Sequence, residues 1–214
     1  MSVFPDPRRV RGDIVALGDD LAVDTLRDAY RHGIFPWPHE RMPLPWFSPR
    51  RRTVILFDEL HVGRTLRKAM NRSEFTFTID RDFPAVIRAC AADRPNQRGG
   101  GTWIDDHVVA AYTRFHDAGD VHSVEVWRDE ELVGGLYGVD AGGLFTGESM
   151  FYRVSDASKL ALVFLIDHLR SRGATWIDCQ VMTPHMEALG AREIPRAKFL
   201  DMLAAAQAAG LRLF

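Results

Sequence analysis

Two carboxylates and one amide lie in strand-like segments that are otherwise apolar. In TWIDCQV, residues 175–181, strand alternation places Asp178 and Gln180 on one face and Ile177 on the other. Glu148 lies in a second apolar and aromatic segment, GGLFTGESMF. A buried carboxylate is costly unless it is paired or hydrogen-bonded. Each carboxylate is therefore either part of a structural ion pair or a functional group, and the pattern alone favours neither.

Other reactive residue types lack the spacing of a known site. The glycines at 99–101 match neither a dinucleotide-binding turn nor a phosphate-binding loop, because no Gly-Lys-Ser/Thr follows. Residues 147–151, GESMF, begin like a hydrolase nucleophile elbow but lack its closing glycine. A cysteine in a buried strand is more often inert core than a nucleophile. No metal site is expected, because the candidate ligands have no recurring spacing: Cys179, His185, His168 and His122.

A mixed sheet with helices on its faces is predicted to position these groups. Three strand-like runs joined by short turns, at 122–127, 131–139 and 143–150, predict an antiparallel meander. A helix over 157–171 then leads to the strand at 175–181, which we expect to be central and covered on both faces. Further helices are expected at 61–71, 82–92, 105–117, 184–189 and 196–208, and further strands at 53–57 and 75–79. The predicted fold class is α/β, with an α+β mixed sheet.

The first sixty residues differ from the rest in composition. They hold most of the eleven prolines and one credible helix, over 21–32, with Gly33 just past its end. The segment GIFPWPHERMPLPWFSP, residues 33–49, can be neither a regular helix nor a central strand. Its four aromatic rings predict an ordered loop rather than a linker.

Composition bounds the class of protein. The chain has 214 residues, of which 46% are hydrophobic, as in ordinary globular proteins. No apolar run approaches the roughly 20 residues that span a bilayer, and the N-terminus has Pro, Asp and Arg where a signal peptide needs an apolar stretch. Two distant cysteines, Cys90 and Cys179, exclude a disulfide framework. We expect a soluble cytoplasmic protein.

Charge is distributed unevenly along the chain. The net charge of −2 argues against charge-driven coating of DNA. Yet residues 1–72 carry a net charge of +4 and residues 73–214 carry −6. Basic clusters are usually solvated surface, but three in one third of the chain favour a localised polyanion site. The clusters are Arg8, Arg9 and Arg11; Arg50, Arg51 and Arg52; and Arg64, Arg67, Lys68 and Arg72.

Ten short segments, in order along the chain, carry a resemblance to a known family. They are YRHGIFPWP, PWFSPR, HVGRTLRK, GTWI, HSVEVW, ELVGGLYGV, GESMF, ASK, IDCQV and ALGAREIPR. Together they resemble the leucyl/phenylalanyl-tRNA–protein transferases over nearly the whole chain. The chain departs from the family pattern at residues 18–20, Gly-Asp-Asp, where two glycines usually precede the aspartate, and at Phe47, where a second Trp is common.

The resemblance implies an aminoacyltransferase that moves Leu or Phe, and less readily Met, from aminoacyl-tRNA to the α-amine of proteins with N-terminal Arg or Lys, marking them for degradation. It implies a small N-terminal domain, 1–60, and a larger N-acetyltransferase-like domain, 61–214. Because the ester of the donor is already activated, no ATP, metal or other cofactor is expected. The expected partners are aminoacyl-tRNA and Arg- or Lys-led proteins, with no DNA, no membrane and a monomeric enzyme.

The resemblance also assigns roles to residues. Asp178 acting with Gln180 is expected to take the proton of the attacking amine, and Glu148 to orient that amine or hold the cationic acceptor. The aminoacyl side-chain pocket is expected at residues that could equally be ordinary core: Leu136, Phe145, Met150, Leu165 and Ile177. The terminal adenosine is expected to stack on aromatic rings, at Trp46, Phe47 and Trp103. Acceptor-stem phosphates are expected to meet a basic helix, at Arg64, Arg67, Lys68 and Arg72.

Two other functions fit part of the sequence. An acyl-CoA N-acyltransferase on the same fold would need a Gly-rich, pyrophosphate-binding turn before the long helix, but residues 153–159, RVSDASK, contain no glycine. A non-catalytic tRNA-binding module would not explain Asp178 and Glu148 within apolar strands. Binding of acetyl-CoA or of Phe-tRNA separates these alternatives.

Overall fold

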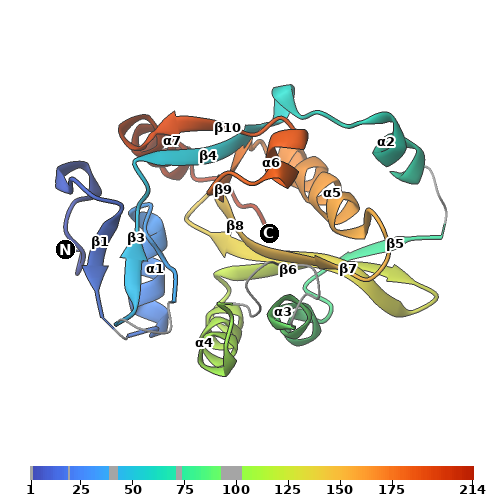
Figure 1. Ribbon diagram of the computed structural model, residues 1–214, viewed down its shortest axis with the longest axis horizontal. Helices are drawn as coiled ribbons and strands as arrows, with labels where there is room; N and C mark the ends of the chain where they lie inside the picture. The colour runs from blue at the N-terminus through green and yellow to red at the C-terminus, as the bar shows by residue number, and fades with distance from the viewer. Residues whose placement is uncertain (1, 19, 39–42, 71–73, 93–102) are drawn as a thin grey trace.

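The computed structural model describes residues 2–18, 20–38, 43–70, 74–92 and 103–214. These residues form a three-stranded sheet near the N-terminus and a seven-stranded mixed sheet (Figure 1). The small sheet has the order β1-β3-β2 and the large sheet the order β10-β4-β9-β8-β7-β6-β5. All neighbours in the large sheet are antiparallel except β8 and β9, which are parallel. The mixed α/β fold class predicted from the sequence is confirmed.

Six strands, β4 to β9, follow the predicted segments closely, whereas β1, β2, β3 and β10 were not predicted as strands. In the small sheet they are β1 (Ile14–Leu17), β2 (Phe35–Pro36) and β3 (Pro45–Phe47). In the large sheet they are β4 (Arg51–Leu56), β5 (Thr76–Ile79), β6 (Val121–Arg128), β7 (Glu131–Asp140), β8 (Phe145–Tyr152), β9 (Trp176–Gln180) and β10 (Arg192–Pro195). The predicted meander is β6-β7-β8, and β9 lies between β4 and β8, as expected for the strand that follows a long crossover helix.

The helices begin and end near the residues that the sequence indicates. They are α1 (Val23–Arg31), α2 (Arg64–Met70), α3 (Phe83–Ala91), α4 (Asp106–Asp117), α5 (Ala157–Ser171), α6 (Pro184–Ala188) and α7 (Arg196–Ala209). Two short 3₁₀ helices cover Pro7–Arg9 and Phe57–Glu59. Side-chain caps start three of the described α-helices. Asp82 accepts a hydrogen bond from the Ala85 N–H, Asp105 accepts one from the Val108 N–H, and Thr183 accepts one from the Met186 N–H. None of the described helices is both long enough and apolar enough to cross a membrane.

One glycine lets the crossover helix approach the sheet closely. A Cβ atom at Gly134 of β7 would lie 2.5 Å from the Cβ of Ala157, the first residue of α5. Only a residue without a side chain fits between the two backbones at this point. The start of α5 is thereby held against β7, so that its later turns can reach the space between β8 and β9.

Two parts of the N-terminal prediction differ from the structure. The proline-rich segment, predicted to hold no central strand, provides β3, the middle strand of the small sheet. Pro45 is tolerated there because it starts the strand and contributes its carbonyl, which accepts a hydrogen bond from the Trp37 N–H at 3.0 Å. Strand β4, which lies within the predicted domain 1–60, belongs to the large sheet.

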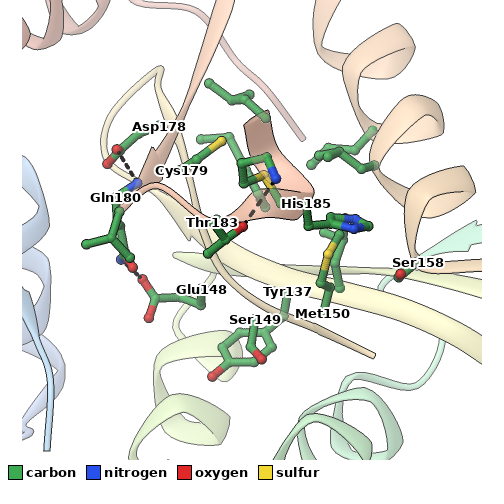
Figure 2. A pocket seen from close by; sticks show the side chains of 18 of the residues that line it. Tyr137, Glu148, Ser149, Met150, Ser158, Asp178, Cys179, Gln180, Thr183 and His185 are labelled. Carbon is green, nitrogen blue, oxygen red and sulfur yellow. Dashed lines mark hydrogen bonds between the residues drawn. The ribbon is translucent and has the colours of Figure 1, made fainter. Parts of the chain in front are cut away.

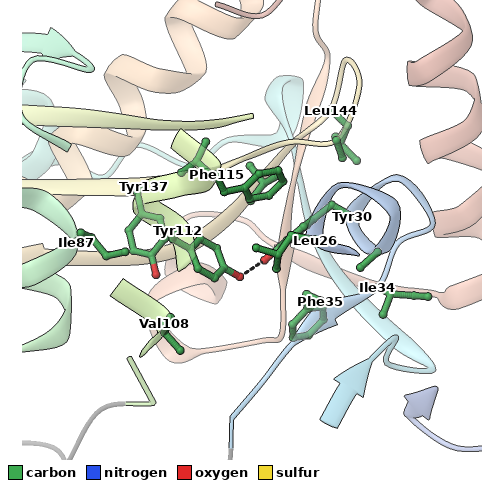
Figure 3. Close-up of a cluster of buried hydrophobic side chains, with 14 of the residues drawn as sticks. Leu26, Tyr30, Ile34, Phe35, Ile87, Val108, Tyr112, Phe115, Tyr137 and Leu144 are labelled. Atoms are coloured by element: carbon green, nitrogen blue, oxygen red, sulfur yellow. Dashed lines mark hydrogen bonds between the residues drawn. The ribbon is translucent and has the colours of Figure 1, made fainter. Parts of the chain in front are cut away.

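Helices cover both faces of the large sheet, and a core lies under each. Helix α5 packs on β6, β7 and β8 from one side. From the other side α3 packs on the same three strands and α4 packs on β6 (Figure 1). The core on the α3–α4 side extends to the N-terminal helix, where Leu26 and Tyr30 of α1 meet Tyr112 and Phe115 of α4 (Figure 3). This shared core carries α1 side chains to the large sheet.

Candidate active site

A cavity of about 510 Å³ lies where the parallel strands β8 and β9 separate. These strands are in register at Thr146 and Asp178, and the residues that follow on each strand line the cavity. Figure 2 shows Glu148, Gln180 and Asp178 together at one end, with Met150 and Ser158 toward the other. The cavity therefore has a polar end and an apolar end.

The apolar end contains all five residues predicted for a side-chain pocket: Leu136, Phe145, Met150, Leu165 and Ile177. Four of them are buried and also belong to the core beneath α5, while Met150 is partly buried. They are therefore core residues that also line the cavity. The sequence reasoning missed Leu162, which lies one turn before Leu165 on α5 and also lines the cavity; its spacing on the helix could have shown this.

Glu148 is the centre of the polar end. Its Oε1 accepts hydrogen bonds from Gln180 Nε2 at 2.6 Å and from the Tyr30 hydroxyl at 2.7 Å. Its Oε2 accepts a longer one, 3.4 Å, from the Tyr112 hydroxyl, and the two hydroxyl oxygens are 2.5 Å apart. Burial raises the pKa of Glu148 to about 8, despite the opposing effect of these hydrogen bonds. The sequence did not point to Tyr30 or Tyr112, which reach the site from α1 and α4.

Asp178 is fully buried and forms a two-pronged ion pair. Arg52 Nε donates to Oδ1 at 2.8 Å, and Arg52 Nη2 donates to Oδ2 at 2.6 Å. The Thr146 hydroxyl also donates to Oδ2 at 3.1 Å, and the backbone N–H of Gln180 donates to Oδ1 at 2.9 Å. The sequence allowed either a structural ion pair or a functional group at Asp178. In the structure Asp178 forms an ion pair at the edge of the cavity.

Gln180 has an unusual backbone conformation. Its φ is 62°, in the left-handed region that non-glycine residues rarely occupy. The Val181 N–H donates to the Cys179 carbonyl at 2.8 Å, so Gln180 is the central residue of a tight γ-turn. The bond from its own N–H to Asp178 holds this turn, which directs the Gln180 side chain toward Glu148.

Comparisons with known proteins match this chain to one family. The model of the leucyl/phenylalanyl-tRNA protein transferase matches residues 54–204, and the model of its N-terminal domain matches residues 19–50. The chain belongs to this family. Curated leucyl/phenylalanyl-tRNA–protein transferases are similar: one from Chromohalobacter salexigens is 55% identical over 190 residues, 89% of this chain and 73% of the relative. Another, from Pseudomonas fluorescens, is 52% identical over 204 residues, 94% and 89% of the two chains.

The chain is therefore an aminoacyltransferase that works with tRNA. Among solved structures, L-PGS from Bacillus licheniformis is similar at a TM-score of 0.42 and 15% identity, covering 71% of this chain and 48% of that one.

The aromatic residues of the transferase are placed differently from the prediction. Trp103 lines the cavity, as does Trp37, which the sequence reasoning had not selected for stacking. Trp46 is 2% exposed and packs on Phe4, with ring centroids 4.8 Å apart, so its ring has no face open to a nucleobase. Phe47 packs edge-on against Trp37 at 5.5 Å and does not line the cavity. The Pro-Trp-Pro sequence that fixes Trp37 in an aromatic loop is the signal that could have identified it.

The basic clusters of the transferase also differ from one another. Arg50, Arg51 and Arg52 each pair with a carboxylate, of Asp13, Glu193 and Asp178 respectively. By contrast, Arg64, Arg67 and Lys68 are exposed on α2, and no acidic side chain of the described residues pairs with them. Arg72, the fourth predicted phosphate contact, lies outside the described residues.

Metal binding and nucleophilic catalysis by cysteine each depend on particular side chains. Within the part of the chain that the structure describes, no group of three or more His, Cys, Asp or Glu side chains could hold a metal ion. Burial raises the pKa of the Cys179 thiol strongly, and the charge of Asp178 adds to this effect. Cys179 is therefore an inert thiol at neutral pH, as its position in an apolar strand suggested.

Proposed function

We propose that this transferase moves Leu or Phe, and less readily Met, from aminoacyl-tRNA to the α-amine of proteins that begin with Arg or Lys, marking them for degradation. One observation supports this most directly: an apolar pocket and a pair of carboxylates share one cavity. The apolar end suits the donor side chain, and the carboxylate end suits a cationic acceptor. The reaction belongs in the cytoplasm, where aminoacyl-tRNA is made.

The apolar end supports a preference for Leu and Phe. Its walls are mostly hydrocarbon and aromatic, and Met150 is an unbranched, adaptable side chain that can adjust to a branched or a flat group. Apolar pockets discriminate by only about 1–3 kcal/mol per methylene, so Met is expected to enter as a weaker donor. The matching position of all five predicted residues supports this role for the pocket.

The tRNA is proposed to contact two regions. Trp37 and Trp103 line the cavity and can stack on the terminal adenosine, an interaction worth about 1–3 kcal/mol per base. Arg64, Arg67 and Lys68 on α2 are exposed cations that can contact acceptor-stem phosphates. Base stacking positions the ester at the cavity, and phosphate contacts add affinity that depends on salt.

The chemistry needs little more than placement and the removal of one proton. The α-amine has a pKa of about 7.7–8.0, so a useful fraction is neutral at neutral pH. Its nitrogen attacks the ester carbonyl carbon, and the bond from that carbon to the ribose oxygen breaks. The hydrogen-bonded group of Glu148, Gln180 and Asp178 is proposed to hold the amine and receive its proton.

A direct transfer assay tests the proposal. Labelled Leu-, Phe- and Met-tRNA are incubated with peptides that differ only in an N-terminal Arg, Lys, Ala or Glu. Transfer to the Arg- and Lys-led peptides, fastest from Leu or Phe, is the expected result. Transfer without regard to the N-terminal residue, or acetylation of the same peptides from acetyl-CoA in place of transfer from tRNA, would overturn it.

A further inference from the structure

Arg52 is a buried cation at the junction of the two sheets. Its side chain is 2% exposed, and its guanidinium lies between the rings of Phe35 of β2 and Phe199 of α7, at 4.6 and 4.5 Å from their centroids. Nη1 donates to the Gly33 carbonyl at 3.4 Å. Desolvated stacking between two aromatic faces favours a planar guanidinium over an ammonium. The position is thus specific for Arg and joins the N-terminal segment, β4, β9 and α7.

The hydrogen bonds of Asp178 leave it no capacity to accept a proton. A carboxylate offers about four lone-pair positions. Arg52 Nε and the Gln180 N–H occupy Oδ1, while Arg52 Nη2 and the Thr146 hydroxyl occupy Oδ2. A proton could enter only if one of these donors left. Asp178 is therefore suited to anchoring its neighbours.

Glu148 does have that capacity. Its Oε1 accepts two short hydrogen bonds, whereas Oε2 accepts only the 3.4 Å bond from the Tyr112 hydroxyl among the described residues. Its side chain lines the cavity and is only partly buried. The Gln180 side chain holds Glu148 by a hydrogen bond, and Asp178 holds the turn at Gln180 by accepting its N–H. Arg52 in turn orients Asp178 through their ion pair.

We propose that Arg52 is a positioning residue of this active site, and that Glu148 receives the proton of the attacking amine while the Arg52–Asp178 pair holds Gln180, and through it Glu148, in place. In this step the amine nitrogen bonds to the ester carbonyl carbon, and the carbon–oxygen bond to the ribose breaks. The nitrogen's proton passes to the Glu148 carboxylate and from there to the departing ribose oxygen. The inference rests on the proposed function and assigns the roles within it.

The charges around Glu148 make the inference testable by pH. Glu148 faces Tyr30 of α1, Tyr112 of α4 and Tyr137 of β7, as well as the charged pair of Arg52 on β4 and Asp178 on β9. Burial is the main cause that raises its pKa to about 8; the charge of Asp178 raises it further and that of Arg52 lowers it. Removing the charge of Asp178 must therefore lower the pKa of Glu148, and removing the charge of Arg52 must raise it.

The first experiment measures single-turnover transfer from Phe-tRNA to an Arg-led peptide. Arg52→Lys keeps the charge but loses the two-pronged bond and the stacking, and we expect the rate to fall about 10- to 100-fold, as a displacement of about 1 Å would cause. Arg27→Lys is the matched control. Arg27 forms the same two-pronged pair with Asp120 away from the cavity, through Nε at 2.9 Å and Nη2 at 2.6 Å. The transfer rate of Arg27→Lys should stay within about twofold of wild type. Equal rates for Arg52→Lys and wild type would overturn the positioning role.

The second experiment measures the pH profile of kcat/KM for the peptide, which reports the free enzyme and the free amine. In wild type two groups must lose a proton, Glu148 and the amine, so log kcat/KM should rise with a slope of about two below pH 7.5. Glu148→Gln should reduce that slope to about one. Asp178→Asn should keep both ionisations, but the ionisation of Glu148 should appear at lower pH in the profile. In Arg52→Met it should appear at higher pH.

Since Arg52→Met leaves a buried carboxylate unpaired, the double variant Arg52→Met/Asp178→Asn provides a folded test without either charge. It should transfer as slowly as Asp178→Asn alone, because Gln180 has lost its anchor in both. If the ionisation of the enzyme group disappeared from the profile of Asp178→Asn, or remained in that of Glu148→Gln, Asp178 would be the proton acceptor. Either result would overturn the inference. A wild-type enzyme that transfers nothing would instead overturn the proposed function, and the inference with it.

Discussion

The charged groups beside the cavity and those on α2 are used in opposite ways. Asp178 and Arg52 are buried and paired, and Glu148 is enclosed by hydroxyl and amide donors. The cations of α2 are exposed, and no described acidic side chain pairs with them. Buried charges interact strongly over short distances and hold geometry, whereas exposed charges act through water and are screened by salt. This contrast fits the proposed function, in which the cavity performs the chemistry and α2 contributes to tRNA affinity.

The largest expected effect tests the cavity side of this comparison. Glu148→Gln is nearly isosteric and removes the carboxylate, so kcat should fall about 10²- to 10⁴-fold, by the same factor at low and at moderate salt. The control is Glu125→Gln, which changes another buried carboxylate, bonded to the hydroxyls of Ser123 and Thr78, outside the cavity. Its kcat should be unchanged. A loss in Glu148→Gln that vanishes at higher salt would contradict a chemical role.

Stacking on Trp37 should give an intermediate effect that involves no charge. Trp37→Ala removes one aromatic wall of the cavity, and use of Phe-tRNA should fall about 10- to 100-fold, mainly through KM. Trp37→Phe should restore part of the loss because a smaller ring still stacks. Steady-state kinetics with Phe-tRNA and with a minimal aminoacyl-adenosine should show the same loss for both donors. If only the full tRNA were affected, Trp37 would contact the stem and not the terminal adenosine.

The α2 cations should have a smaller, salt-dependent effect. Arg64→Ala with Lys68→Ala should weaken tRNA binding about tenfold at low salt and lower the slope of log K against log salt by about 1.5. Aminoacyl-adenosine transfer should be unaffected, because this donor has no stem. Exposed cations on other elements, Lys198 and Arg212, provide a control double variant. An equal loss with both donors would make the α2 residues structural.

The smallest expected effect concerns stability rather than rate. The pKa of Glu148 is about 8 in the folded protein against 4.5 for an ordinary glutamate. Because the folded state holds this proton more tightly, its stabilising effect is complete below about pH 4.5 and is lost as pH rises through 8. The Tm of wild type relative to Glu148→Gln should therefore fall by several degrees between pH 5 and 8.5, as followed by circular dichroism. A difference that is constant with pH would contradict the raised pKa.

Local structure was largely predictable from the sequence. The helix predicted over 157–171 is α5 at the same residues, and the strand predicted over 175–181 is β9 within one residue at each end. Helix periodicity and strand alternation are short-range patterns, so they are visible in single segments. The prediction for the proline-rich segment was wrong where β3 becomes central, because pairing with β1 and β2 outweighs the weak strand propensity of proline.

The candidate site was predictable only in part. The apolar lining was predictable because the resemblance to the family places it by motif position, and the same residues line the cavity. Trp46 was selected for stacking although its ring is buried, and Trp37 was overlooked although it lines the cavity. Residue type indicates that a ring can stack but does not tell which face of it is left open after packing. Stacking on the adenosine therefore stays a prediction, now for Trp37 and Trp103.

The sequence by itself determined the helices, six of the strands, the family and the presence of two carboxylates in apolar strands. Only the tertiary structure decided which partners each carboxylate has, since these partners come from distant parts of the chain. Arg52 is 126 residues from Asp178, and Tyr30 is 118 residues from Glu148. Such pairs depend on strand order, on register and on the packing of α1 against α4. Because of these long-range contacts, Asp178 has a donor at every lone-pair position, whereas Glu148 can still accept a proton. No local sequence pattern encodes this difference.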